Sequence, residues 1–225
     1  LQDAGIDFDL SPAEFPFMSM KEGHIGGLPA RIFRISFTGE LSYEINVAAR
    51  HCLALWTHLM KAGKPHGITP YGTEAMHVLR AEKGFIIVGQ ETDGSVTPHD
   101  LGMNWIVSKT KSDFIGKRAL ARETMAYDNR KQLVGLLCSE PSTVIPEGAH
   151  AVLDPDQPMP MEMLGQVTSS YFSPNCGRSI AMAMLKGGHA RKGETVFFPM
   201  LDGTVFEAKI VDPVVFDPKG ERIDG

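Results

Sequence analysis

The sequence predicts an α+β fold in which a mixed region of helices and strands precedes an all-β region. In residues 1–127, stretches that alternate apolar and polar side chains lie beside segments with helical periodicity. From residue 132 onward, β-like runs recur at intervals of about ten to fifteen residues and are separated by Gly, Pro and Asp. The pattern of predicted elements changes at residues 128–130, which we interpret as a linker. We therefore expect two domains, 1–127 and 128–225.

The chain is expected to begin irregularly, because two prolines interrupt residues 1–22. Residues 30–37 then alternate in polarity and are rich in β formers, which predicts a strand. A turn at residues 38–40 leads to a second predicted strand, residues 41–47, on which Glu44 projects from the polar face.

Three helices are expected in the first region. Residues 48–62 have apolar side chains at helical spacing, and Gly63 is placed to end the helix. A second helix is predicted over residues 72–83, followed by a glycine, and a third over residues 116–126. In the second region the predicted strands are residues 132–138, 149–153, 165–171, 179–185, 195–198 and 206–211.

Composition excludes several classes of function. A net charge of −5 argues against a general nucleic-acid binder, which normally presents a basic surface. No stretch approaches the ~18 apolar residues of a membrane-spanning helix, so we expect no membrane partner. Three widely spaced cysteines favour buried free thiols in a reducing compartment, and hence a cytoplasmic location, over a disulfide framework.

The common motifs of nucleotide, metal and serine-nucleophile sites are absent from the sequence. No GxGxxG or P-loop pattern occurs, and neither does GxSxG. The eight histidines include no HxH or HExxH pair, so no metal site is expected. Any function must therefore come from less general motifs.

Three motifs occur in order along the first region. They are FTGELSYE at residues 37–44, LRAEKG at 79–84 and TPHDLGMNW at 97–105. Together they resemble the folate-binding aminomethyltransferase family, the glycine-cleavage T-protein and its relatives, with its patterns (Y/F)TGExGxE, LRxExG and TPxExGLxW. The resemblance implies part of an aminomethyltransferase-like domain followed by an antiparallel β-barrel or jelly-roll-like domain.

Within the family, further stretches are similar to the C-terminal end of the α subunits of heterotetrameric sarcosine oxidases. These stretches are FPFM at residues 15–18, the run at 27–47 and FDPKGERIDG at 216–225. Such subunits are longer than this chain, so the resemblance implies an NAD-binding part and half of the folate domain upstream. The acidic residue that organises the family's transfer centre would lie there too, which leaves no catalytic residue to be named in this chain.

The resemblance assigns three folate-binding residues. Glu44 would accept two hydrogen bonds from the 2-amino group and N3–H of the reduced pterin, a bidentate contact that suits a carboxylate. Arg80 would pair with the glutamyl tail, with a salt bridge to Glu82 or Glu74 as the structural alternative. Phe37 would stack near the pterin, although a core aromatic is the alternative.

By the same resemblance, the chain is the tetrahydrofolate-binding part of an enzyme that oxidises sarcosine. The iminium formed at a flavin would be captured to give 5,10-methylenetetrahydrofolate and glycine. FAD, FMN and NAD would bind elsewhere in the assembly, the partners would be the β, γ and δ subunits, and this chain alone would be inactive.

Two alternatives remain open from the sequence. The chain can be an assembly module whose folate site has decayed, a reading favoured by Phe37 in place of the usual tyrosine and by Val88. It can also be part of a related folate-dependent demethylase acting on another methylated substrate.

Overall fold

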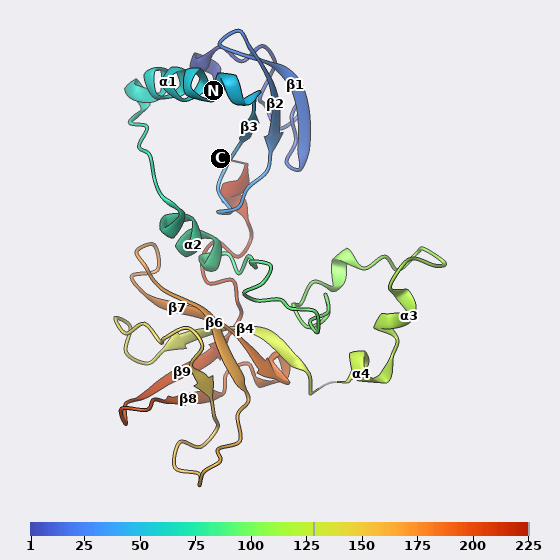
Figure 1. The fold of residues 1–225 in the computed structure, drawn as a ribbon, viewed down its shortest axis with the longest axis vertical. Coiled ribbons are helices and arrows are strands. Elements are labelled where there is room, and N and C mark those ends of the chain that lie inside the picture. The colour runs from blue at the N-terminus through green and yellow to red at the C-terminus, as the bar shows by residue number, and fades with distance from the viewer. Residues whose placement is uncertain (128, 225) are drawn as a thin grey trace. The chain divides into compact units, whose positions relative to one another are not determined.

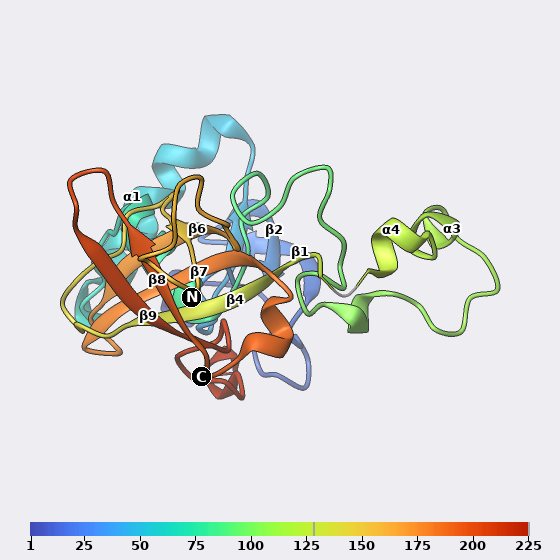
Figure 2. The ribbon, with the colours of Figure 1, turned by 90° about the horizontal axis from the view of Figure 1, so that it is seen from below.

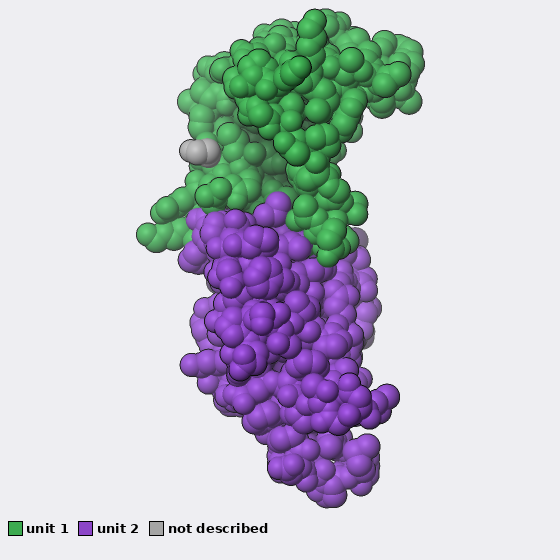
Figure 3. Space-filling model, turned by 90° about the vertical axis from the view of Figure 1, so that its left-hand side faces the viewer, with its two compact units in different colours: residues 1–77, 219–225 green, residues 78–218 purple. Residues whose placement is uncertain are grey.

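The computed structural model describes residues 1–127 and 129–224. The chain forms two compact units, Leu1–His77 with Lys219–Gly225 and Val78–Pro218, which are coloured separately in Figure 3. The boundary between these units lies between His77 and Val78, inside a helix (Thr73–Glu82), rather than at the predicted linker after residue 127. The domains 1–127 and 128–225 stay a prediction, and Asp128 of the expected linker lies outside the described residues.

Unit 1 contains a three-stranded antiparallel sheet in the order β1-β2-β3 (Figure 1). The strands are β1 (Ser19–Ile25), β2 (Leu28–Arg34) and β3 (Glu44–Asn46). Gly26 and Gly27, with φ of 56° and 79°, form the two-residue turn of the β1–β2 hairpin. This turn requires positive φ at both positions, which glycine adopts without steric cost.

The structure corrects the expected strand limits in unit 1. The opening segment is not irregular to residue 22, because β1 begins at Ser19. β2 ends at Arg34 rather than at residue 37, and β3 covers Glu44–Asn46 instead of residues 41–47. The alternating pattern therefore extends beyond the positions that pair with β2.

The core of unit 1 lies between the sheet and α1 (Cys52–Gly63). Phe15, Ile25 and Ile32 are fully buried, and Leu55 is the buried residue of the helix. The helix ends at a glycine, as the sequence predicts, but begins four residues later than expected, after a 3₁₀ turn. The short 3₁₀ helices of the chain are Gln2–Ala4, Ala49–His51, Lys64–His66, Asn104–Ile106, Gly188–Arg191 and Glu221–Ile223.

Unit 2 contains a six-stranded antiparallel sheet in the order β5-β6-β7-β4-β9-β8. Its strands are β4 (Lys131–Cys138), β5 (His150–Ala151), β6 (Gly165–Ser173), β7 (Arg178–Lys186), β8 (Thr195–Pro199) and β9 (Val205–Val211). Val152, next to β5, exchanges two backbone hydrogen bonds of 2.9 Å with Phe197 of β8. Because this bridge joins the two edge strands, the sheet closes into a barrel. The all-β region predicted from residue 132 is confirmed, as is the α+β class.

The barrel has a core on each face of its central strand β7. Ala181, Ala183 and Leu185 point into the barrel interior, where they pack with Phe198 and Ile210. The alternate residues of β7 pack outside the barrel, in a cluster that is lined also by Ala81 at the end of α2 (Thr73–Glu82). Burial on both faces explains why β7 is an almost continuous apolar run. The members of the outer cluster include Leu133, Ile180, Met182, Met184, Ile86, Val96 and Leu101.

The third expected helix is wrong as a single element. The structure has α3 (Lys117–Leu120) and α4 (Glu123–Ala126), separated because Arg122 is extended, with ψ of 142°. In both ribbon views this segment extends away from the barrel strands of unit 2 (Figure 1 and Figure 2). Among the described residues, no helix has the length and hydropathy needed to cross a membrane.

The cysteines are all free thiols, but one differs from expectation. Cys138 is buried in the barrel interior and Cys176 is half-buried. Cys52 is exposed at the start of α1, so the expectation of three buried thiols is wrong for this residue.

Candidate functional site

Glu44 lies on β3, at the edge of the sheet of unit 1. Its side chain is exposed, and Asn46, two residues along the same strand face, donates a hydrogen bond of 2.9 Å from Nδ2 to Oε1. The neighbouring Ile45 points to the opposite face and packs on the core. Strand alternation thus presents the Glu44 carboxylate outward, as the sequence predicts.

Apolar side chains continue from Glu44 across the same face of the sheet. Phe33 of β2 is paired directly with Glu44, and Met20 of β1 is paired with Phe33. Phe33 is half-buried and Met20 is 45% exposed. A carboxylate beside a half-exposed apolar row suits a flat ligand with one polar edge.

Phe37 lies in unit 1 between β2 and the turn at residues 38–40. Its side chain is 42% exposed, so the alternative of a buried core aromatic does not describe it. Gly39 follows in the left-handed region, with φ of 74°, and fixes the turn toward β3. The structure therefore places both Phe37 and Glu44 at the surface of one unit, on either side of this turn.

Arg80 belongs to unit 2 and is fully buried. Its guanidinium donates to Glu91 Oε2 at 3.0 Å, to Ser169 Oγ at 2.6 Å and to the carbonyl of Phe85 at 3.0 Å. Ser169 in turn donates to Glu91 Oε1 at 2.5 Å, which closes a cycle of three side chains. The Tyr171 ring lies 5.9 Å from the guanidinium carbon.

The partner of Arg80 is neither of the two glutamates that the sequence suggests. Glu82 accepts instead from Ser173 at 2.5 Å and from Asn175 at 2.9 Å, and Lys83 pairs with Asp217. The charged residues of LRAEKG thus fix the end of α2 to the barrel. Gly84, with φ of 64°, completes this contact, because an added Cβ would lie 3.0 Å from the backbone of Pro213.

Sequence reasoning missed the residues around Arg80. Glu91 is 11 positions away, and Ser169 and Tyr171 are 89 and 91 positions away. No motif joins these segments, and a Ser in a β run gives no sign that it faces a buried cation. Only the packing of the loop after α2 against β6 brings them together.

The TPHDLGMNW motif forms a second buried polar cluster in unit 2. The Asp100 carboxylate accepts from Thr97 N and Oγ1, both at 2.8 Å, and from Arg130 Nη2 at 2.7 Å. Burial raises the pKa of the Asp100 carboxyl, but the hydrogen bonds from Arg130 and Thr97 outweigh burial and hold the pKa below its usual range. Asp100 is thus an ionised structural group, while its neighbour His99 is exposed and lies 2.6 Å from Asn104.

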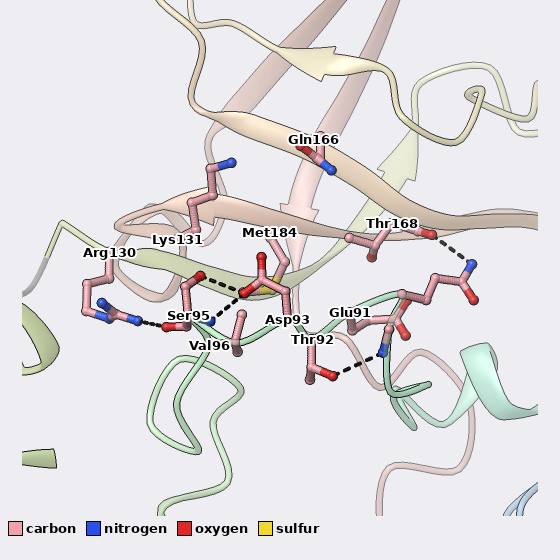
Figure 4. Close-up of a pocket in the computed structure, with 12 residues that line it drawn as sticks. Glu91, Thr92, Asp93, Ser95, Val96, Arg130, Lys131, Gln166, Thr168 and Met184 are labelled. Carbon is pink, nitrogen blue, oxygen red and sulfur yellow. Dashed lines mark hydrogen bonds between the residues drawn. The ribbon is translucent and has the colours of Figure 1, made fainter. Parts of the chain in front are cut away.

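A polar cavity of about 380 Å³ lies beside these clusters in unit 2 (Figure 4). Gln90 and Glu91, which contact Arg80, line it, and so does Arg130. Asp93 also lines it, and hydrogen bonds from Ser95 hold the pKa of this carboxyl below its usual range. Figure 4 shows Arg130 and Lys131 on one side and Glu91 and Thr168 on the other. The three residues predicted to bind folate do not line it.

Two family models match this chain in succession. The model described as "GCVT N-terminal domain" matches residues 1–111. The model described as "Glycine cleavage T-protein C-terminal barrel domain" matches residues 131–217, which include all six strands of the barrel.

Curated relatives extend the comparison. The sarcosine oxidase subunit alpha of Corynebacterium sp. (strain P-1) is 49% identical over 222 residues, covering 96% of this chain and 22% of that protein. The corresponding subunit of Rhizobium meliloti (strain 1021) is 41% identical over 228 residues, covering 97% of this chain and 22% of that protein. The aminomethyltransferase of Chlorobaculum parvum (strain DSM 263 / NCIMB 8327) is 34% identical over 195 residues, covering 87% of this chain and 50% of that protein.

The chain therefore spans about a fifth of the length of these sarcosine oxidase relatives. Among solved structures, glycine cleavage system aminomethyltransferase T from Bartonella henselae matches with a TM-score of 0.75 at 25% identity. The match covers 90% of this chain and 53% of that one. The resemblance predicted from the three motifs is confirmed, and the chain belongs to the glycine cleavage T-protein family.

Proposed function

We propose that this chain is the tetrahydrofolate-binding part of a sarcosine oxidase α subunit. The similarity to sarcosine oxidase subunits along 96% and 97% of the chain supports this assignment. The single observation in the structure that carries it is the exposed Glu44 carboxylate beside the apolar row of Phe33 and Met20.

The residues at this place fit a reduced pterin. Its 2-amino group and N3–H form a paired donor edge, and one carboxylate accepts both hydrogen bonds. Glu44 presents such a carboxylate to solvent, and Asn46 orients it from the side. Phe33, and Phe37 just before the turn, supply aromatic faces against which a pterin ring can pack.

Tetrahydrofolate, when bound, would accept the one-carbon unit of oxidised sarcosine and leave as 5,10-methylenetetrahydrofolate, with glycine as the second product. Glu44 would hold the ring in one orientation, and Phe37 would limit the access of water, which otherwise releases formaldehyde. Positioning and exclusion of water suffice because an iminium is already electrophilic. FAD, FMN and NAD sites, the β, γ and δ subunits and a cytoplasmic location belong to the proposed assembly.

Two roles of Arg80 compete: contact with the folate tail, and support of the fold. A direct contact with the glutamyl tail of folate stays a prediction from the family resemblance. Its complete burial and its bonds to Glu91 and Ser169 favour a supporting role that fixes α2 on the barrel. Contact with the tail would require the guanidinium of Arg80, which is fully buried, to become accessible.

Titration calorimetry with tetrahydrofolate, under reducing and anaerobic conditions, tests the proposal on the intact protein. Glu44→Gln keeps the size of the side chain but removes its charge. We expect tetrahydrofolate to bind at least about tenfold more weakly, since a charge-assisted bond contributes about 1.5–3 kcal/mol. Glu22→Gln is the matched control, because Glu22 lies on the same face of the same sheet and pairs with Arg31.

Equal binding by the wild-type protein and the Glu44→Gln variant would contradict the assignment of Glu44. Absence of binding by the wild-type protein would contradict the proposed function as a whole. A loss in the Glu22→Gln variant as large as that in Glu44→Gln would show that the sheet responds to any change of charge.

The second candidate is an assembly module without folate binding. Burial of Arg80 favours it, because the arginine of the LRAEKG motif then serves the fold alone. The same titration decides between the candidates, since an assembly module would bind no tetrahydrofolate but would still bring the other subunits together.

A further inference from the structure

The last residues of this chain belong to unit 1, although they follow the whole of unit 2 in the sequence. Lys219–Gly225 belong to the same compact unit as Leu1–His77. We call residues 219–224 the C-terminal clasp. A short 3₁₀ helix, Glu221–Ile223, begins directly after Gly220, whose φ is 69°.

One contact of the clasp reaches the turn that follows Phe37. Arg222 Nε donates to both carboxylate oxygens of Glu40, each at 2.7 Å. Glu40 closes the turn at residues 38–40, in which Thr38 is buried and Gly39 has φ of 74°. The charged contact thus holds the end of the turn from which the chain continues to Glu44.

A second contact reaches the end of β2. Arg34, the last residue of this strand, is 1% exposed and donates from Nη2 to Asp224 at 3.0 Å. Its Nη1 donates to the carbonyl of the buried Phe15 at 2.9 Å. A buried guanidinium without a carboxylate would carry a large desolvation penalty, so Asp224 contributes to keeping the end of β2 in place.

The two contacts bracket one segment. Arg34 and Glu40 lie at the two ends of residues 35–39, which contain Phe37, and β3 with Glu44 begins four positions after Glu40. Residues 35–43 belong to no helix or strand, and within them Thr38 is buried and Tyr43 packs against Phe15 in the core of unit 1. Contacts at both of its ends therefore restrict it more than either would alone.

The residues that precede the clasp are held by bonds within unit 2. The amides of Val215 and Phe216 donate to the carbonyl of Glu82, each at 3.0 Å, and Asp217 pairs with Lys83, all within unit 2.

We propose that the C-terminal clasp positions Phe37 and Glu44 for the ligand, with Arg222 and Asp224 as positioning residues that do not touch it. This inference rests on the proposed function, because it assigns a further role toward the same tetrahydrofolate site. Disruption of the clasp should loosen the segment of residues 35–46 and weaken binding of the pterin, while the barrel stays intact.

The test uses charge reversal and its compensation in the intact protein. Arg222→Glu places two carboxylates together, and the double variant Glu40→Arg/Arg222→Glu restores an ion pair of reversed polarity. Lys219→Glu is the matched control, because it makes the same change of charge in the same clasp at an exposed pair with Glu221. Tetrahydrofolate affinity and hydrogen exchange of residues 35–46 are measured for each protein, with Glu44→Gln as the reference for a lost ligand contact.

We expect Arg222→Glu to weaken tetrahydrofolate binding about fivefold and to speed exchange of residues 35–46 at least about threefold. The double variant should recover most of both effects, and Lys219→Glu should show neither. Unchanged affinity or exchange in Arg222→Glu, failure of the double variant to recover, or an equal effect of Lys219→Glu would each overturn the clasp. If Glu44→Gln weakens binding but Arg222→Glu does not, only the clasp fails; if the wild-type protein binds no tetrahydrofolate, the proposed function fails and the clasp's positioning role fails with it.

Discussion

Arg80 and Glu91 form an ion pair from which water is fully excluded, since both side chains are 0% exposed. Removal of a charged group from water costs desolvation free energy. The ion pair offsets this free energy only where the remaining hydrogen-bonding groups also have partners. Ser169 and the carbonyl of Phe85 accept hydrogen bonds from the two terminal nitrogens of Arg80. The Nε of Arg80 has no hydrogen-bond partner among the described residues. The pair therefore acts as a unit, and loss of either member leaves the other buried and uncompensated.

Arg80→Met should lower the free energy of unfolding by about 3–5 kcal/mol, because it leaves Glu91 buried without its cation. The double variant Arg80→Met/Glu91→Leu should recover much of this loss. Urea denaturation followed by circular dichroism measures both. Arg31→Met, which breaks an exposed pair with Glu22, is the control and should change stability by less than about 1 kcal/mol.

The same variants separate the two roles of Arg80. If Arg80 only supports the fold, the double variant should bind tetrahydrofolate nearly as the wild-type protein does, since the helix is again packed. A persistent loss of affinity in the stable double variant would contradict the supporting role and favour direct contact with the glutamyl tail.

At the scale of elements, the Asp100–Arg130 pair fixes the loop after α2 to the chain just before β4. Arg130 Nε contacts both oxygens of Asp100 at 2.9 and 3.0 Å, and the backbone N–H of Leu133 donates to the carbonyl of Asp100 at 2.8 Å. The carboxylate and the backbone carbonyl of Asp100 thereby join two segments of the chain. The structure of this region should accordingly depend on the ionisation of Asp100.

Asp100→Asn should lower the free energy of unfolding by about 2 kcal/mol at pH 7, because hydrogen bonds to a charged group are lost. The folded-state pKa of Asp100 lies below its unfolded value of about 3.9. Its stabilisation is thus fully present above that value and is lost as pH falls through the folded pKa. The difference between wild type and variant should therefore shrink below about pH 4.

Denaturant titrations from pH 3 to pH 7 measure this dependence. Asp113→Asn is the matched control, because Asp113 pairs with Arg118 at 4.0 Å on an exposed surface. A difference between wild type and Asp100→Asn that stays constant over this range would contradict the assignment of a stabilising ionised carboxylate.

The ends of the helices and strands show which parts of the fold a local sequence pattern can predict. The six barrel strands occur close to their predicted positions. Each strand of the barrel has one face toward the interior and ends at a turn, so side-chain alternation and turn residues mark it locally in the sequence. β3 is shorter than its alternating pattern, because a strand needs a pairing partner. Its pairing with β2 begins at Glu44, opposite Phe33, one residue before β2 ends at Arg34. The expected helix over residues 116–126 divides in two at Arg122, whose backbone is extended with ψ of 142°.

At the scale of the whole molecule, unit 1 is discontinuous in sequence, because it needs both ends of the chain. The buried Arg34 has its carboxylate partner, Asp224, 190 positions away. The native contacts at the end of β2 therefore depend on a residue far along the sequence. Truncations at the C-terminus should affect unit 1, although they remove residues that follow unit 2.

A protein that ends at Pro218 should show faster hydrogen exchange in β2 and the segment after it, because Arg34 and Glu40 lose their partners. Exchange in β4 and β7 should stay as in the wild type, since the barrel keeps all its strands. Asp224→Ala, which removes only the carboxylate that Arg34 contacts, should give an intermediate effect in β2. Equal exchange in the two proteins would contradict a structural role for the last residues.

The sequence by itself determined the α+β class, the positions of the barrel strands, the family and the outward direction of Glu44. Each of these follows from local information: side-chain alternation, turn glycines and motifs of fewer than ten residues. The tertiary structure alone decided the burial of Arg80 with Glu91, the closure of the barrel through Val152 and Phe197, and the return of the C-terminus to Arg34 and Glu40. These contacts join residues far apart in the chain, and their partners are selected by packing and by the cost of burying an unpaired charge, which no local pattern records.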